Sequence, residues 1–279
     1  MSSDLTACRS LPARPRGNVT EAIGDFPYRL QLAGGWIDQP FVSALNPSPP
    51  GSMVVVSLKP TCRLMDRAGM ATGSRKIALK LWNGRLPDAD PAGLVEELYA
   101  EENRGKAEPS GTQDMIGLIY PGVCRLDYHA GHRGGVFPQH IESNNDPEIA
   151  RWLERVIHLL PVMPRPEGYN PLGVKNLDPA FVRRLGQAGH GCFDAILERN
   201  VEALGASLNE TMICWEALLP HTVRHPTISV DLMALLRCYQ GKFPGAMYSG
   251  CGGGYLTVVS ERAVPGSFRV SVRIANRKP

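Results

Sequence analysis

The sequence lacks several features that would assign it quickly to a class of protein. No apolar run approaches the roughly 18 residues that suggest a transmembrane helix, and the polar first residues contain no apolar core of a signal peptide. The net charge of +3 is close to neutral for 279 residues, whereas a dedicated nucleic-acid-binding protein would carry a clustered basic face. We therefore expect a cytoplasmic protein that binds neither nucleic acid nor membrane.

The common metal and nucleotide signatures are also missing. The seven cysteines include no CxxC pair, and their odd number favours reduced thiols over a disulfide framework. The histidines form no HExxH motif. His221 and His225 are four residues apart, but Pro220 and Pro226 bracket them and oppose a helical metal-binding pair. The Walker motif GxxxxGK[ST] is absent as well.

What the sequence does contain is glycine in two concentrated places. Residues 247–255 read MYSGCGGGY and run into the strand-like residues 255–259, although each glycine inside a regular element costs about 0.5–1 kcal/mol relative to alanine. The pair Gly34–Gly35 lies between a second strand-like run, residues 28–32, and Asp38. Such loops turn sharply or let a ligand approach the backbone closely. Two of them, far apart in the sequence, suggest one phosphate-handling site built from both ends of the chain.

The remaining pattern predicts interspersed strands and helices, with helices concentrated in the second half, which favours an α+β class. Strands are predicted at residues 28–32, 52–58, 255–259 and 268–274, and residues 152–161 fit either a strand or a helix. Helices are predicted at residues 73–82, 91–104, 115–120, 179–189, 192–204, 207–219 and 230–239. Residues 1–24 are predicted to form a flexible N-terminal arm, and residues 126–138 show little pattern.

Three segments carry side chains suited to chemistry, each with a plainer interpretation beside it. In RLQLAGGWID, Asp38 follows a strand and a turn and could accept hydrogen bonds from a hydroxyl-rich ligand, or could be an ordinary turn aspartate. Residues 69–74 (GMATGS) open a helix, so Ser74 could touch a phosphate or its Mg²⁺, or simply cap the helix. Glu102 and Asp114 could serve as metal ligand and base in phosphoryl transfer, or could be solvated carboxylates.

Taken together, the order AGGWxD, small-residue loop, SGTQD and SGCGGGY resembles the GHMP kinase superfamily, named for galactokinase, homoserine kinase, mevalonate kinase and phosphomevalonate kinase. The resemblance is closest to fucokinase-like and heptose-kinase-like sugar kinases, whose first motif reads like AGGWTD and whose middle motif reads like GGxQDQ. It spans about residues 28–260. It implies a two-lobed α+β fold, with a ribosomal-S5-domain-2-like N-terminal lobe at residues 25–140 and a ferredoxin-like C-terminal lobe at residues 141–279.

The resemblance also implies roles for matching positions. It implies Asp114 as the base and Arg29 near the transferred phosphate, with ATP and Mg²⁺ as cofactors and a sugar as substrate. The other implied residues are Asp38, Trp36, Gly35 and Gly253 for the substrate, Gly69, Ala71, Thr72, Gly73, Ser74, Gly250 and Gly252 for the nucleotide, and Ser74 and Glu102 for the metal. Because fucokinase-like and heptose-kinase-like enzymes act at the anomeric hydroxyl, a sugar 1-phosphate is the expected product. A monomer or homodimer active in carbohydrate metabolism is expected.

Some positions depart from the family pattern. The loop reads RAGMATGSRKIA where the family has PxGxGLGSSA, so Ala71 replaces a glycine and Arg75–Lys76 replace small residues; Met115 replaces a glutamine. The segment from Asp38 to Gly69 is also short. These departures keep two alternatives open: a catalytically silent sugar-binding or regulatory protein on the same fold, and a kinase of a non-sugar alcohol. Trp36 favours a sugar if its ring stacks on a pyranose, and is otherwise a core aromatic.

Overall fold

Two four-stranded antiparallel sheets organise the chain, in a computed structural model that describes residues 24–46 and 50–275. The predicted arm at residues 1–24 lies, except for Gly24, outside the described residues. The first sheet has the order β1-β2-β3-β4 and is built from β1 (Tyr28–Gln31), β2 (Gly51–Leu58), β3 (Val123–Tyr128) and β4 (His140–Asn144). The last of these strands extends the first sheet four residues beyond the expected lobe boundary at residue 140.

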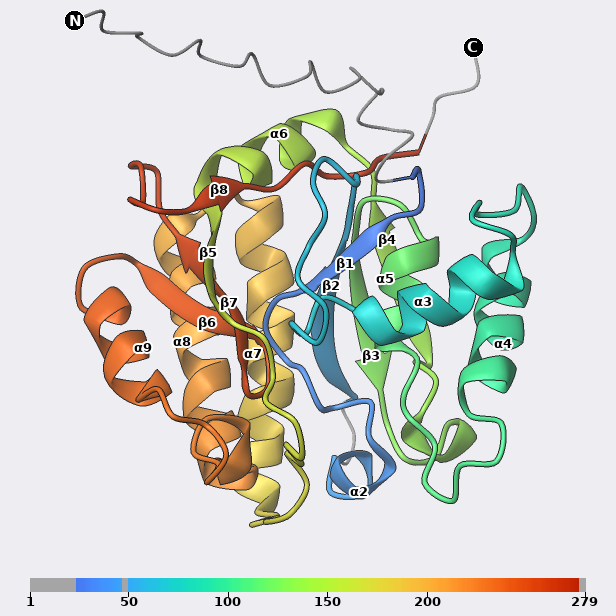
Figure 1. The fold of residues 1–279 in the computed structure, drawn as a ribbon, viewed down its shortest axis with the longest axis horizontal. Helices are drawn as coiled ribbons and strands as arrows, with labels where there is room; N and C mark the ends of the chain where they lie inside the picture. The colour runs from blue at the N-terminus through green and yellow to red at the C-terminus, as the bar shows by residue number, and fades with distance from the viewer. Residues whose placement is uncertain (1–23, 47–49, 276–279) are drawn as a thin grey trace, which may run out of the picture.

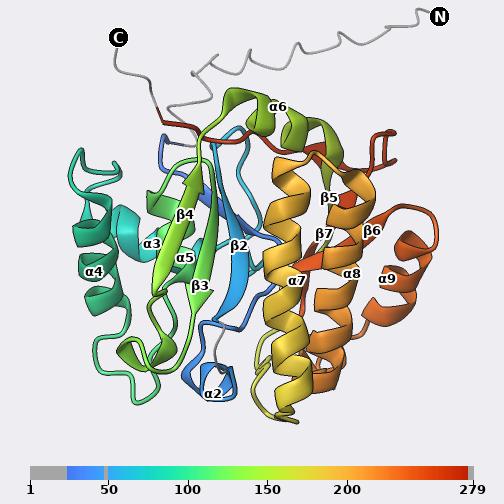
Figure 2. The same ribbon diagram turned by 180° about the vertical axis from the view of Figure 1, so that it is seen from behind.

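Helices cover the first sheet on one face. These are α3 (Thr72–Leu81), α4 (Pro91–Glu102) and α5 (Gln113–Ile119), which lie in front of the strands in Figure 1 and behind them in Figure 2. The short helix α2 (Pro40–Ser43) follows β1, and a 3₁₀ turn, η1 (Arg133–Gly135), precedes β4. All eight residues of β2 are buried, because α5 and α7 (Pro179–Leu197) both pack on this strand. Burial on both faces explains its nearly continuous apolar sequence.

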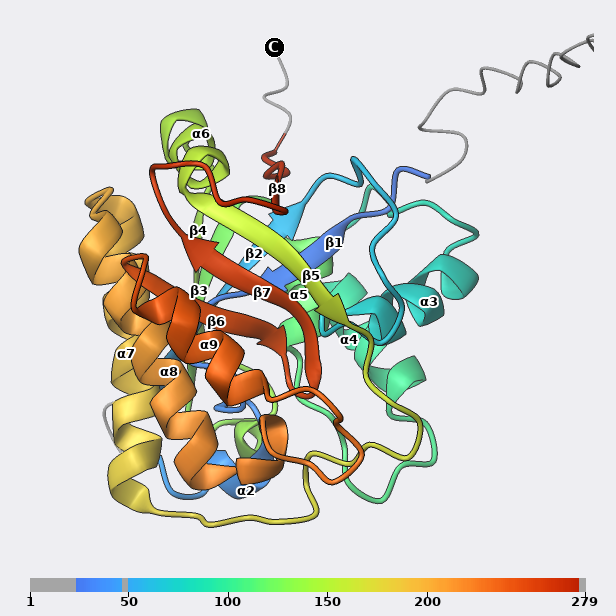
Figure 3. The ribbon, with the colours of Figure 1, turned by 60° about the vertical axis from the view of Figure 1, so that its left-hand side comes forward.

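The second sheet has the order β6-β7-β5-β8. Its strands are β5 (Ile157–Met163), β6 (Gly245–Gly250), β7 (Gly253–Val259) and the two-residue β8 (Phe268–Arg269). Figures 1 and 2 show α7 and α8 (Val201–Leu218) side by side on one face of this sheet. In Figure 3, β6, β7 and β5 run next to one another, with α9 (Leu232–Gln240) beside β6. The remaining elements are α6 (Pro147–Val156) and η2 (Pro220–Thr222).

The helix predictions for residues 179–219 were wrong in number: two long helices occupy the region where three were expected. The break predicted near Gly189 is absent because this glycine lets α7 approach β2, where an added Cβ would lie 2.9 Å from the Cα of Met53. Gly205 is inside α8 for the same reason, since its Cβ would lie 2.7 Å from the backbone nitrogen of Gly245. The two helices separate at Arg199, which has a left-handed backbone (φ 55°), and Asn200 then caps α8.

Other differences concern strands. Residues 152–161 are neither one strand nor one helix, because α6 ends at Val156 and β5 begins at Ile157. The unpatterned residues 126–138 contain the end of β3, and the predicted strand at 268–274 pairs with β5 over two residues only. Val272 instead bridges to Leu58 of β2. The segment predicted as a glycine-rich loop is a β-hairpin, in which β6 and β7 are joined across Cys251 and Gly252.

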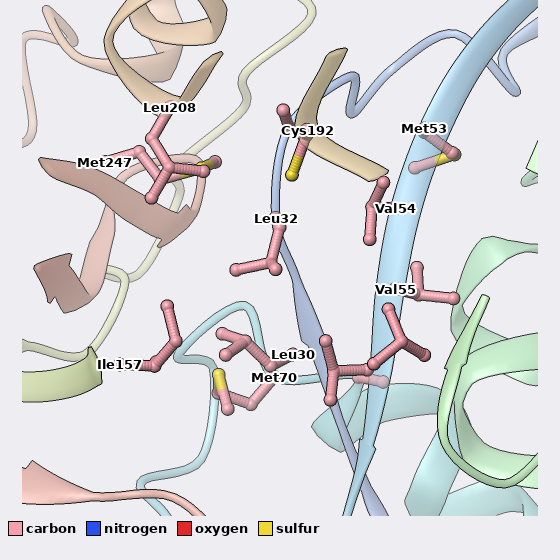
Figure 4. Close-up of a cluster of buried hydrophobic side chains, with 14 of the residues drawn as sticks. Leu30, Leu32, Met53, Val54, Val55, Met70, Ile157, Cys192, Leu208 and Met247 are labelled. Carbon is pink, nitrogen blue, oxygen red and sulfur yellow. The ribbon is translucent and has the colours of Figure 1, made fainter. Parts of the chain in front are cut away.

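One hydrophobic core connects the two sheets. Figure 4 shows buried side chains from β1, β2, α7, α8 and β6 facing one another. The labelled residues, each at most 1% exposed, are Leu30, Leu32, Met53, Val54, Val55, Met70, Ile157, Cys192, Leu208 and Met247. Among the described residues, no helix is both long enough and apolar enough to cross a membrane.

Candidate active site

A cleft of about 660 Å³ lies where segments from both sheets meet. It is lined by residues after and within β1, by the start of α3, by the α4–α5 connection, by the loop after β5 and by the β6–β7 hairpin. Most of the predicted site residues line it: Arg29, Trp36, Asp38, Gly69, Ala71, Thr72, Gly73, Ser74, Glu102, Asp114 and Gly250. Gly35, Gly252 and Gly253 do not.

Unpaired buried polar atoms concentrate in this cleft. Six buried side-chain nitrogen or oxygen atoms among the described residues lack a hydrogen-bond partner, and four of them belong to cleft residues: Arg29 Nε, Asp38 Oδ2, Glu102 Oε2 and Gln113 Oε1. Leaving a buried polar group unpaired costs about 1–3 kcal/mol. Their convergence on one cavity is typical of a site whose partners arrive with a ligand.

Asp114, at the first turn of α5, lies at the centre of the polar contacts. Its Oδ1 pairs with the guanidinium of Arg29, and its Oδ2 accepts a hydrogen bond from the hydroxyl of Ser74 at 3.4 Å. Arg29 is 4% exposed and also donates to the carbonyl of Gly69. Gly117, one turn along α5, makes room for the Arg29 side chain, because an added Cβ would lie against it. These contacts orient the carboxylate and leave lone pairs on both oxygens.

Asp38 is completely buried next to this pair. Its Oδ1 accepts a hydrogen bond from the Gln113 side chain at 3.2 Å, while Oδ2 has no partner. Burial raises the pKa of Asp38 to about 6, against the opposing effect of hydrogen bonds and of Arg29. Burial also lowers the pKa of Arg29 to about 10. Gly111 packs against the Asp38 carboxylate, where a side chain would have no space. Asp38 is therefore not a solvated turn aspartate.

The start of α3 presents free backbone donors to the cleft. Its first helical residue is Thr72, and the preceding Ala71 has a left-handed backbone (φ 54°) and makes no side-chain cap. Ser74 is thus inside the helix and does not cap it. Uncapped N–H groups together with the helix dipole attract anions. Lys76 also lines the cleft and contacts Asp66 at 3.1 Å.

Arg75 has a different role from its neighbour. Its guanidinium points away from the cleft and donates to the carbonyls of Phe26 and Pro27, at 2.9 and 3.0 Å. It also stacks over the ring of Tyr28, at 4.1 Å from the centroid. Burial lowers the pKa of Arg75. This residue therefore ties α3 to the chain before β1 and leaves the helix N-terminus open.

The β6–β7 hairpin contacts the start of α3 backbone to backbone. A Cβ on Gly250 would lie 2.5 Å from the Cα of Gly69, and Gly254 packs equally closely on Ala68. Ser249 Oγ donates to the carbonyl of Ala68 at 2.8 Å. Only glycine permits this approach. The expected contact between the hairpin and the Gly34–Gly35 turn is not found: Gly69 meets the hairpin, whereas Gly34 packs on β2 and Gly35 on Gln31.

The glycines outside the cleft shape its walls. Gly34 (φ 87°) lies against β2, and its N–H donates to Thr211 of α8. The carbonyl of Gly35 accepts a hydrogen bond from Trp215, a cleft residue, at 3.0 Å. Gly252 (φ 77°) lies beneath the ring of Tyr169, and Gly253 (φ 107°) faces Met163. These glycines shape the backbone around the cleft and do not themselves line it.

Trp36 lines the cleft in a strained conformation. Its backbone is left-handed (φ 81°), which is rare for a bulky residue, and its side chain is partly exposed. A strained residue at a cavity wall is a frequent feature of binding sites.

Several cleft residues were missed by the sequence reasoning. One signal was available for Gln31: in Tyr28–Gln31, Arg29 and Gln31 alternate with apolar residues, so they share a face of a buried strand. Arg165 and Tyr169 follow β5 in a proline-rich loop without a motif, and nothing local predicts that they reach the hairpin. Arg67 and Lys106 are further cations in the lining.

His221 and His225 lie next to each other. Their rings meet edge to face at 4.8 Å, and His225 also contacts Tyr169. No group of three or more His, Cys, Asp or Glu residues capable of holding a metal occurs within the described part of the chain.

Comparisons with known proteins address the fold. No family model matches the sequence, and no curated protein matches it. Solved structures do match. The mevalonate kinase of Methanococcus jannaschii matches with a TM-score of 0.54 and 11% identity, over 88% of this chain and 92% of that one. A D-glycero-D-manno-heptose 1-phosphate kinase from Bacteriodes thetaiotaomicron matches with a TM-score of 0.51 and 12% identity, over 90% and 95%.

A third similar structure is Lactococcus lactis galactokinase complexed with galactose. Its TM-score is 0.54 and its identity 12%, over 85% of each chain. At this level of identity the likeness concerns the fold, and it extends over nearly the whole length of each protein. The chain therefore has the two-lobed α+β fold of the GHMP kinases, the fold that its sequence motifs predicted.

Proposed function

We propose that this protein is an ATP- and Mg²⁺-dependent small-molecule kinase that phosphorylates a hydroxyl group, the anomeric one, of a sugar or sugar-like polyol. The observation that carries the proposal is the position of Asp114. Its carboxylate lies between a buried arginine and a serine of the uncapped α3 N-terminus, in a cleft that also contains the buried Asp38. An anion-binding helix end beside an oriented carboxylate suits phosphoryl transfer.

Each group has a defined task in this reaction. The N–H groups at the start of α3 bind phosphates of the donor, and Arg29, protonated at neutral pH, offsets negative charge on the moving phosphoryl group. Asp114 accepts the proton of the acceptor hydroxyl. The oxygen of that hydroxyl attacks the terminal phosphorus of ATP, and the bond between this phosphorus and ADP breaks. Asp38 and Gln113 offer unpaired oxygens to the other hydroxyls of the acceptor.

Glu102 and Ser74 fit Mg²⁺ by their chemistry. Both line the cleft, and Glu102 has a buried Oε2 without a partner, with Lys106 3.6 Å from its other oxygen. Mg²⁺ usually takes one or two protein oxygens and fills its remaining positions with phosphate and water, so a larger cluster of carboxylates is not required. When bound, the ion neutralises phosphate charge in the transferring group.

A sugar is favoured over other alcohols by the polar character of the acceptor end. Trp36 offers a partly exposed ring next to Asp38, an arrangement suited to stacking on a pyranose with hydrogen bonds at its edge. Because a mevalonate kinase is among the similar structures, non-sugar alcohols belong in any substrate screen. The alternative of a catalytically silent sugar-binding protein rested partly on Arg75 in the altered loop. This argument is weakened, since Arg75 is turned away from the proposed phosphate-binding end of α3.

The test is a coupled ADP-release screen over aldoses, deoxysugars, heptoses and hydroxy acids, repeated with Asp114→Asn. Removing a general base lowers turnover by about 10²–10⁴-fold, so we expect D114N to lose turnover and to keep Mg·ATP binding in calorimetry. Asp194→Asn, at an exposed site on α7, is the matched control. Turnover by D114N at the wild-type rate would refute the mechanism. Sugar binding without any binding of millimolar Mg·ATP would favour the silent protein.

A further inference from the structure

The cleft carries more positive charge than its own carboxylates balance. Five cations line it, Arg29, Arg67, Lys76, Lys106 and Arg165, against the three carboxylates of Asp38, Glu102 and Asp114. Arg29 pairs with Asp114, Lys106 with Glu102, and Lys76 with Asp66. Within the described residues, neither Arg67 nor Arg165 has a carboxylate within 4.0 Å.

These two arginines are held together at one wall of the cleft. The backbone N–H of Arg165 donates to the carbonyl of Arg67 at 3.0 Å, and the Arg67 guanidinium donates to the carbonyl of Pro166 at 2.5 Å. Arg165 Nε donates to the carbonyl of Cys251 at 2.6 Å, and its Nη2 would lie 2.8 Å from a Cβ on Gly250. A guanidinium has five N–H donors, so most donors of Arg165 stay free while its position against the hairpin is defined.

Arg165 lies close to a second cation and, in the described part of the chain, has no carboxylate partner of its own. Its charge is near enough to Arg29 to help lower the pKa of that residue, which is a repulsion between like charges in a partly buried space. Arg29 has the carboxylate of Asp114 beside it, whereas no carboxylate of the described residues lies within 4.0 Å of Arg165. A guanidinium with free donors in such a place is well suited to a phosphate or carboxylate group of a ligand.

The position favours the acceptor over the donor. The donor phosphates already have the N–H groups at the start of α3 and Lys76 as proposed partners. Arg165 belongs to the loop after β5, which also contributes Tyr169, Pro171 and Leu172 to the cleft. From this arrangement, and resting on the proposed kinase function, we infer that the acceptor is itself anionic: a sugar that bears a phosphate or carboxylate group, which Arg165 and Arg67 bind.

Binding without turnover tests this inference separately from the kinase activity. The probes are glucose, glucose 6-phosphate, glucuronate and inorganic phosphate, titrated by calorimetry without nucleotide into wild type, Arg165→Ala and Arg67→Ala. We expect an anionic sugar to bind at least about tenfold more tightly than glucose, with R165A removing most of that difference and R67A a smaller part. The preference should also weaken as salt concentration rises. Arg155→Ala is the matched control, because it also removes one positive charge, at an exposed position on α6. It should leave the affinity for each probe unchanged.

Kinetics assign the anion to acceptor or donor. Where a sugar turns over, R165A should raise the KM of the acceptor by about tenfold or more and that of ATP by less than about twofold. Arg165→Lys, which keeps the charge, should recover part of the loss, and circular dichroism of each variant reports whether it folds. A raised KM for ATP alone would overturn the inference, and so would equal or absent binding of all anionic probes to wild type and R165A. Selective anion binding without any turnover would instead refute the proposed function and leave the anion site standing.

Discussion

At the scale of single residues, the cleft depends on charged groups that the fold keeps out of water. Asp38 has no exposed surface and Arg29 is 4% exposed, so both are held in place by a few directed contacts and by each other's field. A buried carboxylate with an unpaired oxygen destabilises the folded protein by itself, and function is the reason such groups persist. In the proposed function, Asp38 therefore affects both stability and binding.

We therefore expect Asp38→Asn to raise the stability of the folded protein and to lower its affinity for the substrate that is phosphorylated. Folded Asp38 keeps its proton up to about pH 6, whereas the ordinary value is 3.8. Between these values the native state binds more protons than the unfolded state, so the free energy of unfolding falls as pH rises, by about 3 kcal/mol in total. D38N removes this loss. We expect it to unfold at higher temperature than wild type at pH 8, with the difference shrinking towards pH 4, in thermal melts across that range.

The same titration should be visible in binding. Below pH 6 a protonated Asp38 can accept fewer hydrogen bonds from the hydroxyls of the substrate that is phosphorylated. The affinity for this substrate should therefore rise as pH increases through about 6. D38N should bind the acceptor weakly at every pH. A variant that neither gains stability at pH 8 nor loses acceptor affinity would contradict the assignment of Asp38 as a buried ligand-binding carboxylate.

At the scale of elements, glycine positions decide how closely two backbones approach. Gly189 brings α7 onto β2, Gly205 brings α8 onto the residues before β6, and Gly250 brings the hairpin onto Gly69. None of these acts through a flexible loop. The sequence reasoning treated glycine mainly as a turn or break, which was right for the hairpin turn and wrong inside the two long helices.

The hairpin contact can be tested by Gly250→Ala. The new methyl group would lie 2.5 Å from the Cα of Gly69 and 2.8 Å from Arg165 Nη2, so the start of α3 must shift. Overpacking of this kind typically costs about 1–3 kcal/mol. We expect a lower unfolding midpoint in urea and a weaker affinity for nucleotide, because the segment proposed to bind phosphate moves with Gly69. Gly93→Ala is the control, since its nearest neighbour would be Asp90 Oδ2 at 3.6 Å. An unchanged midpoint in G250A would show that the two segments are not in firm contact.

At the scale of the whole molecule, the two sheets share one core and cannot be treated as separate units. α7 covers β2 of the first sheet and packs beside α8 on the second. The last described residues return to the first sheet, where Arg273 N–H donates to the carbonyl of Ser57 and Lys59 N–H donates to that of Ser271, both at 2.8 Å. The C-terminal lobe therefore supplies part of the burial that the N-terminal lobe needs.

This predicts a single unfolding transition. Tryptophan fluorescence reports on all four tryptophans, among them Trp82 beside the first sheet and Trp215 in α8. It should change at the same temperature as circular dichroism at 222 nm. A fragment ending at residue 145 should not fold, because β2 would lose the helix that buries its second face. Two separate transitions, or a folded fragment, would show that the lobes are independent domains.

Much of the site could be predicted because its chemistry is local. Asp38, Ser74, Glu102 and Asp114 each stand in a short segment whose residue types suit a ligand or a metal, and all four line one cleft. Arg165 could not be found this way. It acts through contacts with Arg67 and Cys251, which are 98 and 86 residues away in the sequence, and its own loop has no motif.

By itself, the sequence determined which residue types sit beside each turn, the α+β class and the likeness to one kinase fold, since these follow from local composition and spacing. Only the tertiary structure decided which glycines meet, which arginine faces the cleft and which is hydrogen-bonded to Phe26. It also decided which carboxylate is buried from solvent. The physical reason is that burial, close backbone approach and the field of neighbouring charges depend on segments distant in the chain. Their effects appear only once the two sheets have packed around the common core.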